Sequence, residues 1–276
     1  MTIDHQPLAY KVGPLEITGF GLAVLAAFVV AQIVAQNELK RRGYSPEPVG
    51  DMIFAAVVGS LLGAKLYFVV LTGDIDTLFS RGGFVFWGGL IGGILAVSIL
   101  VLKRKLGFWR IADVAGLSIM PAYAVGRTGC WAVGDDYGRP WEGPLAVRFP
   151  EGAPPSTAQN MQEMFGIPVP GDVPPNTVLA VHPTQLYEVT MAFILFLVLW
   201  RLRDHKHAEG WLMGVYCVMA GAERFVVEFF RAKDDRFFGP LTVAQVIALV
   251  FIAIGLTVMA MRRRVTAEAR GIYATA

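Results

Sequence analysis

The chain has 276 residues, of which 55% are hydrophobic and 17% are charged, and its formal net charge is +2. Ordinary globular proteins carry roughly 25% charged residues, so this composition excludes a typical soluble domain. The small net charge provides no broad basic surface of the kind that binds nucleic acid. The two cysteines, Cys130 and Cys217, and the four histidines show neither a disulfide framework nor the spacing of a metal site.

Long apolar blocks follow a short polar N-terminal segment. Residues 1–15 include Asp4, His5 and Lys11 and have no apolar centre, so we expect no cleavable signal peptide. Because a membrane-spanning helix needs about 20 mostly apolar residues, the blocks predict about seven spans in an all-α integral membrane protein. The fourth is the least apolar, since it is short and contains Asp113. The predicted spans cover roughly residues 16–36, 51–72, 84–102, 111–127, 183–200, 211–229 and 241–261.

Basic residues follow every second predicted span and orient the bundle. Such clusters mark cytoplasmic loops, which places the N-terminus outside and the C-terminus in the cytoplasm. The whole chain, residues 1–276, is then a single membrane domain, and residues 135–182 form a small, irregular extracytoplasmic head between the fourth and fifth spans. The clusters are Lys40–Arg42, Lys103–Lys105, Arg201 with Arg203 and Lys206, and Arg262–Arg264.

Ionisable residues inside predicted spans are the first candidates for function, because burying charge in a membrane is costly. Arg224, Glu228 and Arg231 are spaced to lie on one face of the sixth span. A buried ion pair that fixes helix packing is one explanation. However, two arginines that share one glutamate leave an excess of positive charge, which favours an anion such as a phosphate.

A glycine-rich segment, residues 126–141, begins at the outer end of the fourth span and brings Arg127, Asp135 and Arg139 to one region. Glycines allow turns and close approach of the backbone to a ligand, although a simple helix exit has the same composition. His182 opens the fifth span, where it is either part of the site or a helix cap. All these groups gather near the predicted outer leaflet, which argues against a transporter with its site at the membrane midplane.

Four glycines in the third predicted span form small-residue pairs at helical spacing: Gly88, Gly89, Gly92 and Gly93. Close packing against another helix is the simpler explanation of such pairs. The alternative is a groove lined by backbone that accepts a lipid headgroup.

Together these motifs resemble the prolipoprotein diacylglyceryl transferase family. The similarity runs over most of the chain, and several separate motifs occur in the same order. The family also has seven membrane helices and an extracytoplasmic head. The motifs are the Gly-Gly-Leu-Ile-Gly-Gly run at 88–93, Gly126-Arg127-x-Gly129, Gly134-Asp135 with Tyr137-Gly138-Arg139, the segment from His182 to Glu188, and the segment from Glu223 to Arg231.

The resemblance implies a reaction as well as a fold. Enzymes of this family transfer the diacylglyceryl group of phosphatidylglycerol to the lipobox cysteine thiol of a prolipoprotein, form a thioether and release glycerol phosphate. They work in the bacterial cytoplasmic (inner) membrane without a metal or organic cofactor. The implied partners are the membrane lipid and prolipoprotein signal peptides that contain a lipobox cysteine.

Residue by residue, the resemblance implies catalytic roles for Arg127, Asp135, Arg224 and Glu228. Arg127, Arg224 and Arg231 are the candidates for stabilising the phosphate of the leaving group. Asp135 or Glu228 would accept the thiol proton, and an alternative role of Glu228 is to orient the arginines. The residues expected to contact the substrates are Arg127, Arg139, Arg231, His182, Gly88, Gly89, Gly92 and Gly93.

Three positions depart from the familiar pattern of the family: Trp87 replaces a histidine, Phe20 a tyrosine and Cys130 an asparagine. Since the arginines and carboxylates are present, we expect the transferase reaction with a proton acceptor other than that histidine. Two alternatives stay open. One is a membrane thiol acyltransferase with Cys130 as nucleophile, and the other is a lipid-binding relative without catalytic activity.

Overall fold

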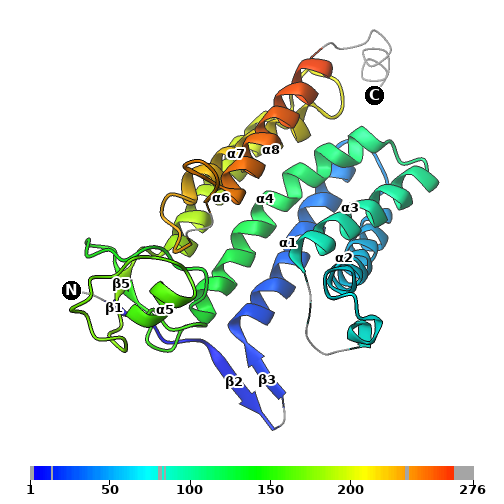
Figure 1. Ribbon diagram of the computed structural model, residues 1–276. Coiled ribbons are helices and arrows are strands. Elements are labelled where there is room, and N and C mark those ends of the chain that lie inside the picture. The colour runs from blue at the N-terminus through cyan, green and yellow to red at the C-terminus, as the bar shows by residue number, and fades with distance from the viewer. Residues whose placement is uncertain (1–2, 14, 80–82, 84, 234–235, 264–276) are drawn as a thin grey trace. The chain divides into compact units, whose positions relative to one another are not determined.

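The computed structural model describes residues 3–13, 15–79, 83, 85–233 and 236–263, and helices dominate them. The long helices, coloured in chain order in Figure 1, are α1 (Gly19–Arg41), α2 (Pro48–Thr72), α3 (Phe86–Lys103), α4 (Phe108–Val133), α6 (Thr184–Leu202), α7 (Trp211–Val227) and α8 (Val243–Met261). The shorter elements are α5 (Ala158–Glu163), a 3₁₀ helix (Ile75–Phe79), β1 (Ile3–Asp4), β2 (Ala9–Val12), β3 (Leu15–Thr18), β4 (Val147–Arg148), β5 (Ala180–Val181), β6 (Arg236–Phe238) and β7 (Leu241–Thr242).

Each predicted apolar block contains one long helix, which confirms the helical prediction. Several of these helices end elsewhere than the sequence pattern predicted, and α1, for example, continues to Arg41, past the predicted end at residue 36. α4 continues to Val133, past the predicted end at Arg127, because carboxylates inside the fold neutralise that arginine. α7 ends at Val227, so Glu228 caps the helix and does not lie within it.

Among the residues that the structure describes, five helices are long and apolar enough to cross a membrane: α1, α2, α3, α6 and α8. α7 has 17 residues and contains Glu223 and Arg224, and α4 contains Asp113 and Arg127. Many large apolar side chains on the five helices are exposed. Such surfaces suit contact with lipid, because the helical backbone is already hydrogen-bonded internally. The chain is thus a mostly helical membrane protein.

Residues 32–115 form one of two compact units of the chain, in which α2 and α3 pack through glycines. Gly88 and Gly92 of α3 approach the backbone of α2 so closely that an added Cβ atom would overlap it. Gly89 and Gly93 face the same helix. These four glycines therefore serve close helix packing, and their use as a lipid groove stays a prediction.

The basic cluster at the end of α1 is tied to carboxylates of the same unit. Glu38 is 1% exposed and lies 2.7 Å from Arg41 and 2.6 Å from Arg42. Arg42 also lies 3.7 Å from the buried Asp113. These charges are paired with one another, so they explain helix packing in this unit.

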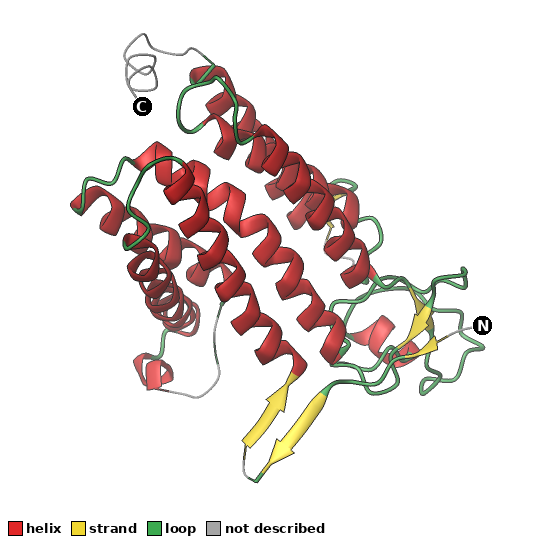
Figure 2. Cartoon of the chain, turned by 180° about the vertical axis from the view of Figure 1, so that it is seen from behind, coloured by secondary structure: helices red, strands yellow, loops and turns green. Residues whose placement is uncertain are grey.

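The second unit consists of residues 1–31 and 116–276, and within it α6, α7 and α8 lie side by side (Figure 1). We call residues 135–182 the head segment. It holds α5 and two strands of the sheet β1–β4–β5 among loops (Figure 2). Its small core is made by Tyr137, Val147, Phe149, Met161, Ile167 and Val181, together with Ala232 from beyond α7.

The loop after α6 contacts the residues that follow α8 in this unit. Ala208 N donates to Arg262 O at 3.1 Å, and His207 Nδ1 lies 3.1 Å from Arg263 O. Arg264, the last residue of its cluster, lies outside the described residues. These contacts lie beyond the C-terminal end of α6. The head segment joins α6 at its N-terminal end, about 28 Å away along a helix of 19 residues.

Candidate active site

The candidate site forms where α4 ends, α6 begins and the chain leaves α7, all in the unit that contains the head segment. Backbone hydrogen bonds hold these places together. Gly138 N donates to His182 O at 2.8 Å, and Arg139 N donates to Phe230 O at 2.8 Å. Side chains from three distant parts of the sequence therefore converge.

Two arginines and two carboxylates form the centre of the site. Arg127 donates to Glu188 at 2.7 Å and to Asp136 at 2.8 Å. Arg231 donates to Asp136 at 2.6 Å, and another of its nitrogens lies 3.6 Å from Glu188. The pairs close a ring of alternating charge, which we call the ion-pair ring. Its members are nearly buried except Asp136, whose side chain is 41% exposed.

The ion-pair ring corrects one expectation from the sequence. An excess of positive charge was predicted for Arg224, Glu228 and Arg231, but in the described site Glu188 and Asp136 supply two further carboxylates. Each arginine is matched because a buried, unpaired guanidinium is strongly unfavourable. An incoming anion must therefore compete with a carboxylate that is already in place.

The sequence motifs predicted no role for three residues of the site: Glu188, Asp136 and Tyr123. Glu188 also accepts a hydrogen bond from the Tyr123 hydroxyl, so three side chains hold this carboxylate. A carboxylate one turn inside an apolar span was the available signal for Glu188. Asp136 carries no comparable signal, because its partner Arg231 is 95 residues away in the sequence.

Arg224 and Glu228 form a second ion pair next to the ring. Their closest atoms are 2.7 Å apart, and the side chains are 32% and 1% exposed, respectively. Glu228 Oε2 also lies 4.0 Å from Arg231 Nε. The carboxylate thus lies between the two arginines, as their spacing predicted, although a turn replaces the helix after Val227.

Asp135 and Cys130 lie beside Arg127, which donates to Cys130 Sγ at 3.1 Å. Burial and the negative charge of Asp136 raise the pKa of Asp135, and a hydrogen bond with Cys130 opposes that shift. Burial also acts to raise the pKa of Asp136, but Arg231 and Arg127 outweigh it and hold this pKa at about 2. Asp135 is therefore the better proton acceptor of the two carboxylates.

Cys130, Asp135 and Asp136 also bring a thiol and two carboxylates within 4.8 Å of one another, a donor set that could hold a metal ion. The guanidinium of Arg127 donates to both Cys130 and Asp136. The fixed cation at this position is thus an arginine.

Arg139 and His182 connect the head segment to the chain after α7. The Arg139 guanidinium donates to the backbone oxygens of Arg231 at 3.1 Å and Lys233 at 3.2 Å. The His182 ring stacks on Trp141 with centroids 4.3 Å apart. Burial lowers the pKa of His182, so its imidazole is neutral near pH 7. Contact of either residue with a substrate stays a prediction.

Several buried polar atoms of the site have no hydrogen-bond partner among the described residues. They are Arg127 Nε, Arg231 Nε, Asp135 Oδ1, Glu223 Oε1 and Glu228 Oε1. An unpaired buried polar group costs about 1–3 kcal/mol, so such groups call for a specific explanation. Their concentration around one cluster is typical of a site that binds a polar ligand.

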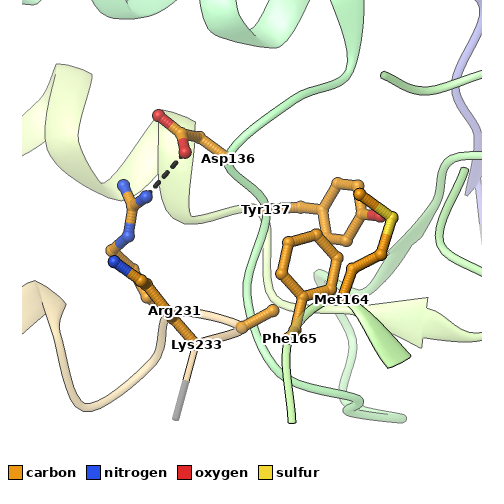
Figure 3. Close-up of a pocket in the computed structure, with 7 residues that line it drawn as sticks. Asp136, Tyr137, Met164, Phe165, Arg231 and Lys233 are labelled. Atoms are coloured by element: carbon orange, nitrogen blue, oxygen red, sulfur yellow. Dashed lines mark hydrogen bonds and ion pairs between the residues drawn. The ribbon is translucent and has the colours of Figure 1, made fainter. Parts of the chain in front are cut away.

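A pocket of about 280 Å³ opens beside Asp136 and Arg231. Figure 3 shows this ion pair on one side of the pocket and Tyr137, Met164 and Phe165 on the other. A ligand in the pocket would therefore reach the exposed side of the ion-pair ring.

Comparison with known proteins identifies relatives over nearly the full length of the chain. A sequence model described as prolipoprotein diacylglyceryl transferase matches residues 7–261. Three similar proteins share the name phosphatidylglycerol–prolipoprotein diacylglyceryl transferase. The protein from Solidesulfovibrio magneticus is 31% identical over 276 aligned positions, which cover 94% of this chain and 95% of the relative. The protein from Geobacter sulfurreducens is 29% identical, with 96% of this chain and 99% of the relative covered. The protein from Clostridium tetani is 27% identical, with 94% of this chain and 98% of the relative covered.

Proposed function

The chain belongs to the prolipoprotein diacylglyceryl transferase family, and we propose that it transfers the diacylglyceryl group of phosphatidylglycerol to the thiol of a lipobox cysteine in prolipoproteins. The cysteine sulfur forms a bond to the glyceryl carbon, the bond from that carbon to the phosphate oxygen breaks, and glycerol phosphate leaves with the electron pair. The thiol proton passes to a base. The names of the relatives support phosphatidylglycerol and a prolipoprotein as substrates.

The observation that carries this proposal is the ion-pair ring. Negative charge develops on the phosphate as its bond to carbon breaks, and fixed cations beside that charge lower the barrier. Glu188 holds the guanidinium groups of Arg127 and Arg231 in place from the buried side. Arg224 extends the same cluster through Glu228. We assign the three arginines to the phosphate group.

Asp135 is the proposed acceptor of the thiol proton. Its Oδ1 atom is buried without a hydrogen-bond partner among the described residues. Its raised pKa suits a general base, since a base must hold the proton that it removes. Glu228 lies between Arg224 and Arg231 and has the separate role of orienting them.

We further propose seven membrane spans in the bacterial inner membrane, with the N-terminus outside, the C-terminus in the cytoplasm, and the head segment and site on the outer side. The support comes from α6. Basic residues that favour the cytoplasm follow its C-terminal end, whereas Glu188 and the head segment lie at its N-terminal end. This placement lets the site meet the lipobox of a signal peptide at the outer leaflet.

A thiol acyltransferase that uses Cys130 is the second candidate, favoured by the contact between Cys130 and Arg127. Cys130 is only 7% exposed, however, and among the described residues its thiol contacts Arg127 and Asp135 and not a histidine base. Direct transfer to the thiol of the substrate needs no such base at Cys130.

The test is transfer by the purified protein in phosphatidylglycerol vesicles with a synthetic lipobox peptide. We expect a thioether-linked diacylglyceryl peptide and an equal amount of glycerol phosphate, and no product with a peptide in which serine replaces the lipobox cysteine. Product carrying a single fatty acyl group would favour the acyltransferase. Binding of phosphatidylglycerol without any product would indicate a lipid-binding relative.

A further inference from the structure

Asp136 bridges the two arginines of the ion-pair ring on the side that faces the pocket. Its Oδ2 accepts from Arg127 at 2.8 Å, and its Oδ1 accepts from Arg231 at 2.6 Å. A phosphate presents its oxygens to a pair of guanidinium groups in the same way. Asp136 therefore lies where the phosphate of a lipid would contact both arginines.

The two carboxylates of the ring differ in how accessible they are. The side chain of Glu188 is 1% exposed and is also held by Tyr123, whereas that of Asp136 is 41% exposed and borders the pocket in Figure 3. Glu188 is thus a permanent partner of the arginines. Asp136 is the carboxylate that an incoming anion can replace.

The backbone of Asp136 is fixed independently of its side chain. Thr184 Oγ1 donates to Asp136 O at 2.7 Å, and Asp136 has a φ of 56°, in the left-handed region that disfavours most side chains. The fold therefore holds this residue at the edge of the ring. Movement of the carboxylate toward the pocket leaves that backbone contact intact.

We propose that Asp136 is a built-in anion that occupies the phosphate position between Arg127 and Arg231, and that the phosphate of the lipid substrate displaces it. The lipid part of this inference rests on the proposed function. A phospholipid gains further contacts through its acyl chains, so it can compete with the carboxylate. Free phosphate and the released glycerol phosphate lack those contacts, and the return of Asp136 expels them.

The variants Asp136→Asn and Asp136→Gly test this inference, because asparagine and glycine both accept a left-handed backbone. Asp172→Asn, an exposed change in the same head segment, is the control for loss of one negative charge. The probes are inorganic phosphate, glycerol phosphate, and phosphatidylglycerol in nanodiscs, and binding is measured at constant ionic strength without a peptide.

If Asp136 occupies the position about nine-tenths of the time, its removal lowers the apparent Kd for all three probes by about tenfold, because apparent affinity scales with the fraction of open sites. Asp172→Asn should bind as the unchanged protein does. Unchanged or weaker binding in both folded Asp136 variants would show that Asp136 is a structural counter-ion and overturn the inference. If inorganic phosphate bound more tightly and phosphatidylglycerol did not, the part of the inference that concerns the lipid would be overturned. Because no transfer is required, these outcomes are independent of whether the proposed reaction occurs.

Discussion

Arg127 and Glu188 are 61 residues apart in the chain, yet their side chains meet at 2.7 Å and are 9% and 1% exposed. The pair joins the end of α4 to the second turn of α6. In a buried environment the removal of one partner leaves an uncompensated charge, which is more costly than the absence of the whole pair. Glu188 therefore fixes both the packing of the two helices and the position of a proposed catalytic arginine.

Glu188→Gln should destabilise the protein, because Arg127 then faces a neutral amide on its buried side. Breaking a buried ion pair costs about 3–5 kcal/mol. We expect a lower midpoint of thermal unfolding in detergent together with a lower kcat. Glu163→Gln changes an exposed glutamate of the head segment and serves as the control. Equal midpoints for the two variants would show that Asp136 alone is sufficient to hold Arg127.

Arg224→Gln and Arg127→Gln should reduce kcat by about 10²–10³, the effect of losing one preorganised donor to a developing anion. Lysine should restore little activity at either position, because it cannot form the two parallel hydrogen bonds of a guanidinium. Arg148→Gln, an exposed change on β4, is the matched control. Near-normal turnover of both glutamine variants at normal membrane levels would remove these arginines from the mechanism.

The helices were predictable from the sequence because a long apolar block has few alternatives to a membrane helix. The contacts of Glu228 with Arg224 and Arg231 were predictable as well, since they depend on residues three and four apart. Both the helices and these contacts depend on residues that are close together in the sequence, and the contacts form even though α7 ends at Val227.

The ion-pair ring was not predictable in the same way. Its three hydrogen-bonded pairs join residues that are 9, 61 and 95 positions apart, and the pair Arg231–Glu188 closes the ring. Which carboxylate neutralises Arg231 depends on how the turn after α4 meets the chain after α7, and no periodic pattern encodes that meeting. The expected excess of positive charge was wrong for this reason: the helical spacing relates only residues of one helix, whereas Asp136 and Glu188 come from elsewhere in the chain.

The rate of transfer should fall as the pH falls through the raised pKa of Asp135, because only the ionised carboxylate accepts a proton. Asp135→Asn should lose this acidic limb of the profile together with most of the activity. Asp136→Asn removes a neighbouring negative charge, so the pKa of Asp135 falls and the limb moves to lower pH. The measurement is kcat/KM against pH for the three proteins. An identical limb in Asp135→Asn would assign the proton transfer to another group.

A topology reporter tests the proposed orientation. A reporter placed after α8 should be active in the cytoplasm, and one inserted beside Asp172 in the head segment should be active outside. The physical reason is that Arg201, Arg203 and Arg262 at the ends of α6 and α8 favour the cytoplasmic side. Reversed activities would place the ion-pair ring at the inner leaflet and contradict a site at the outer leaflet.

Cys130 distinguishes direct transfer from a mechanism with an enzyme-bound intermediate. It contacts Arg127, and a neighbouring cation favours a reactive thiolate in general. Direct transfer nevertheless needs no thiol on the enzyme, because the substrate supplies its own. The buried Cys130 then acts through packing and through its contacts with Arg127 and Asp135. We therefore expect Cys130→Ala and Cys130→Asn to keep substantial transferase activity.

Mass spectrometry of the protein during turnover provides the second measurement. Direct transfer leaves Cys130 unmodified, whereas a thiol intermediate adds the mass of a lipid group to the peptide that contains it. Cys217→Ala is the matched control, since Cys217 is also buried and lies on α7. A folded but inactive Cys130→Ala protein, combined with a trapped lipid adduct on Cys130 in the unchanged protein, would replace direct transfer with a two-step mechanism.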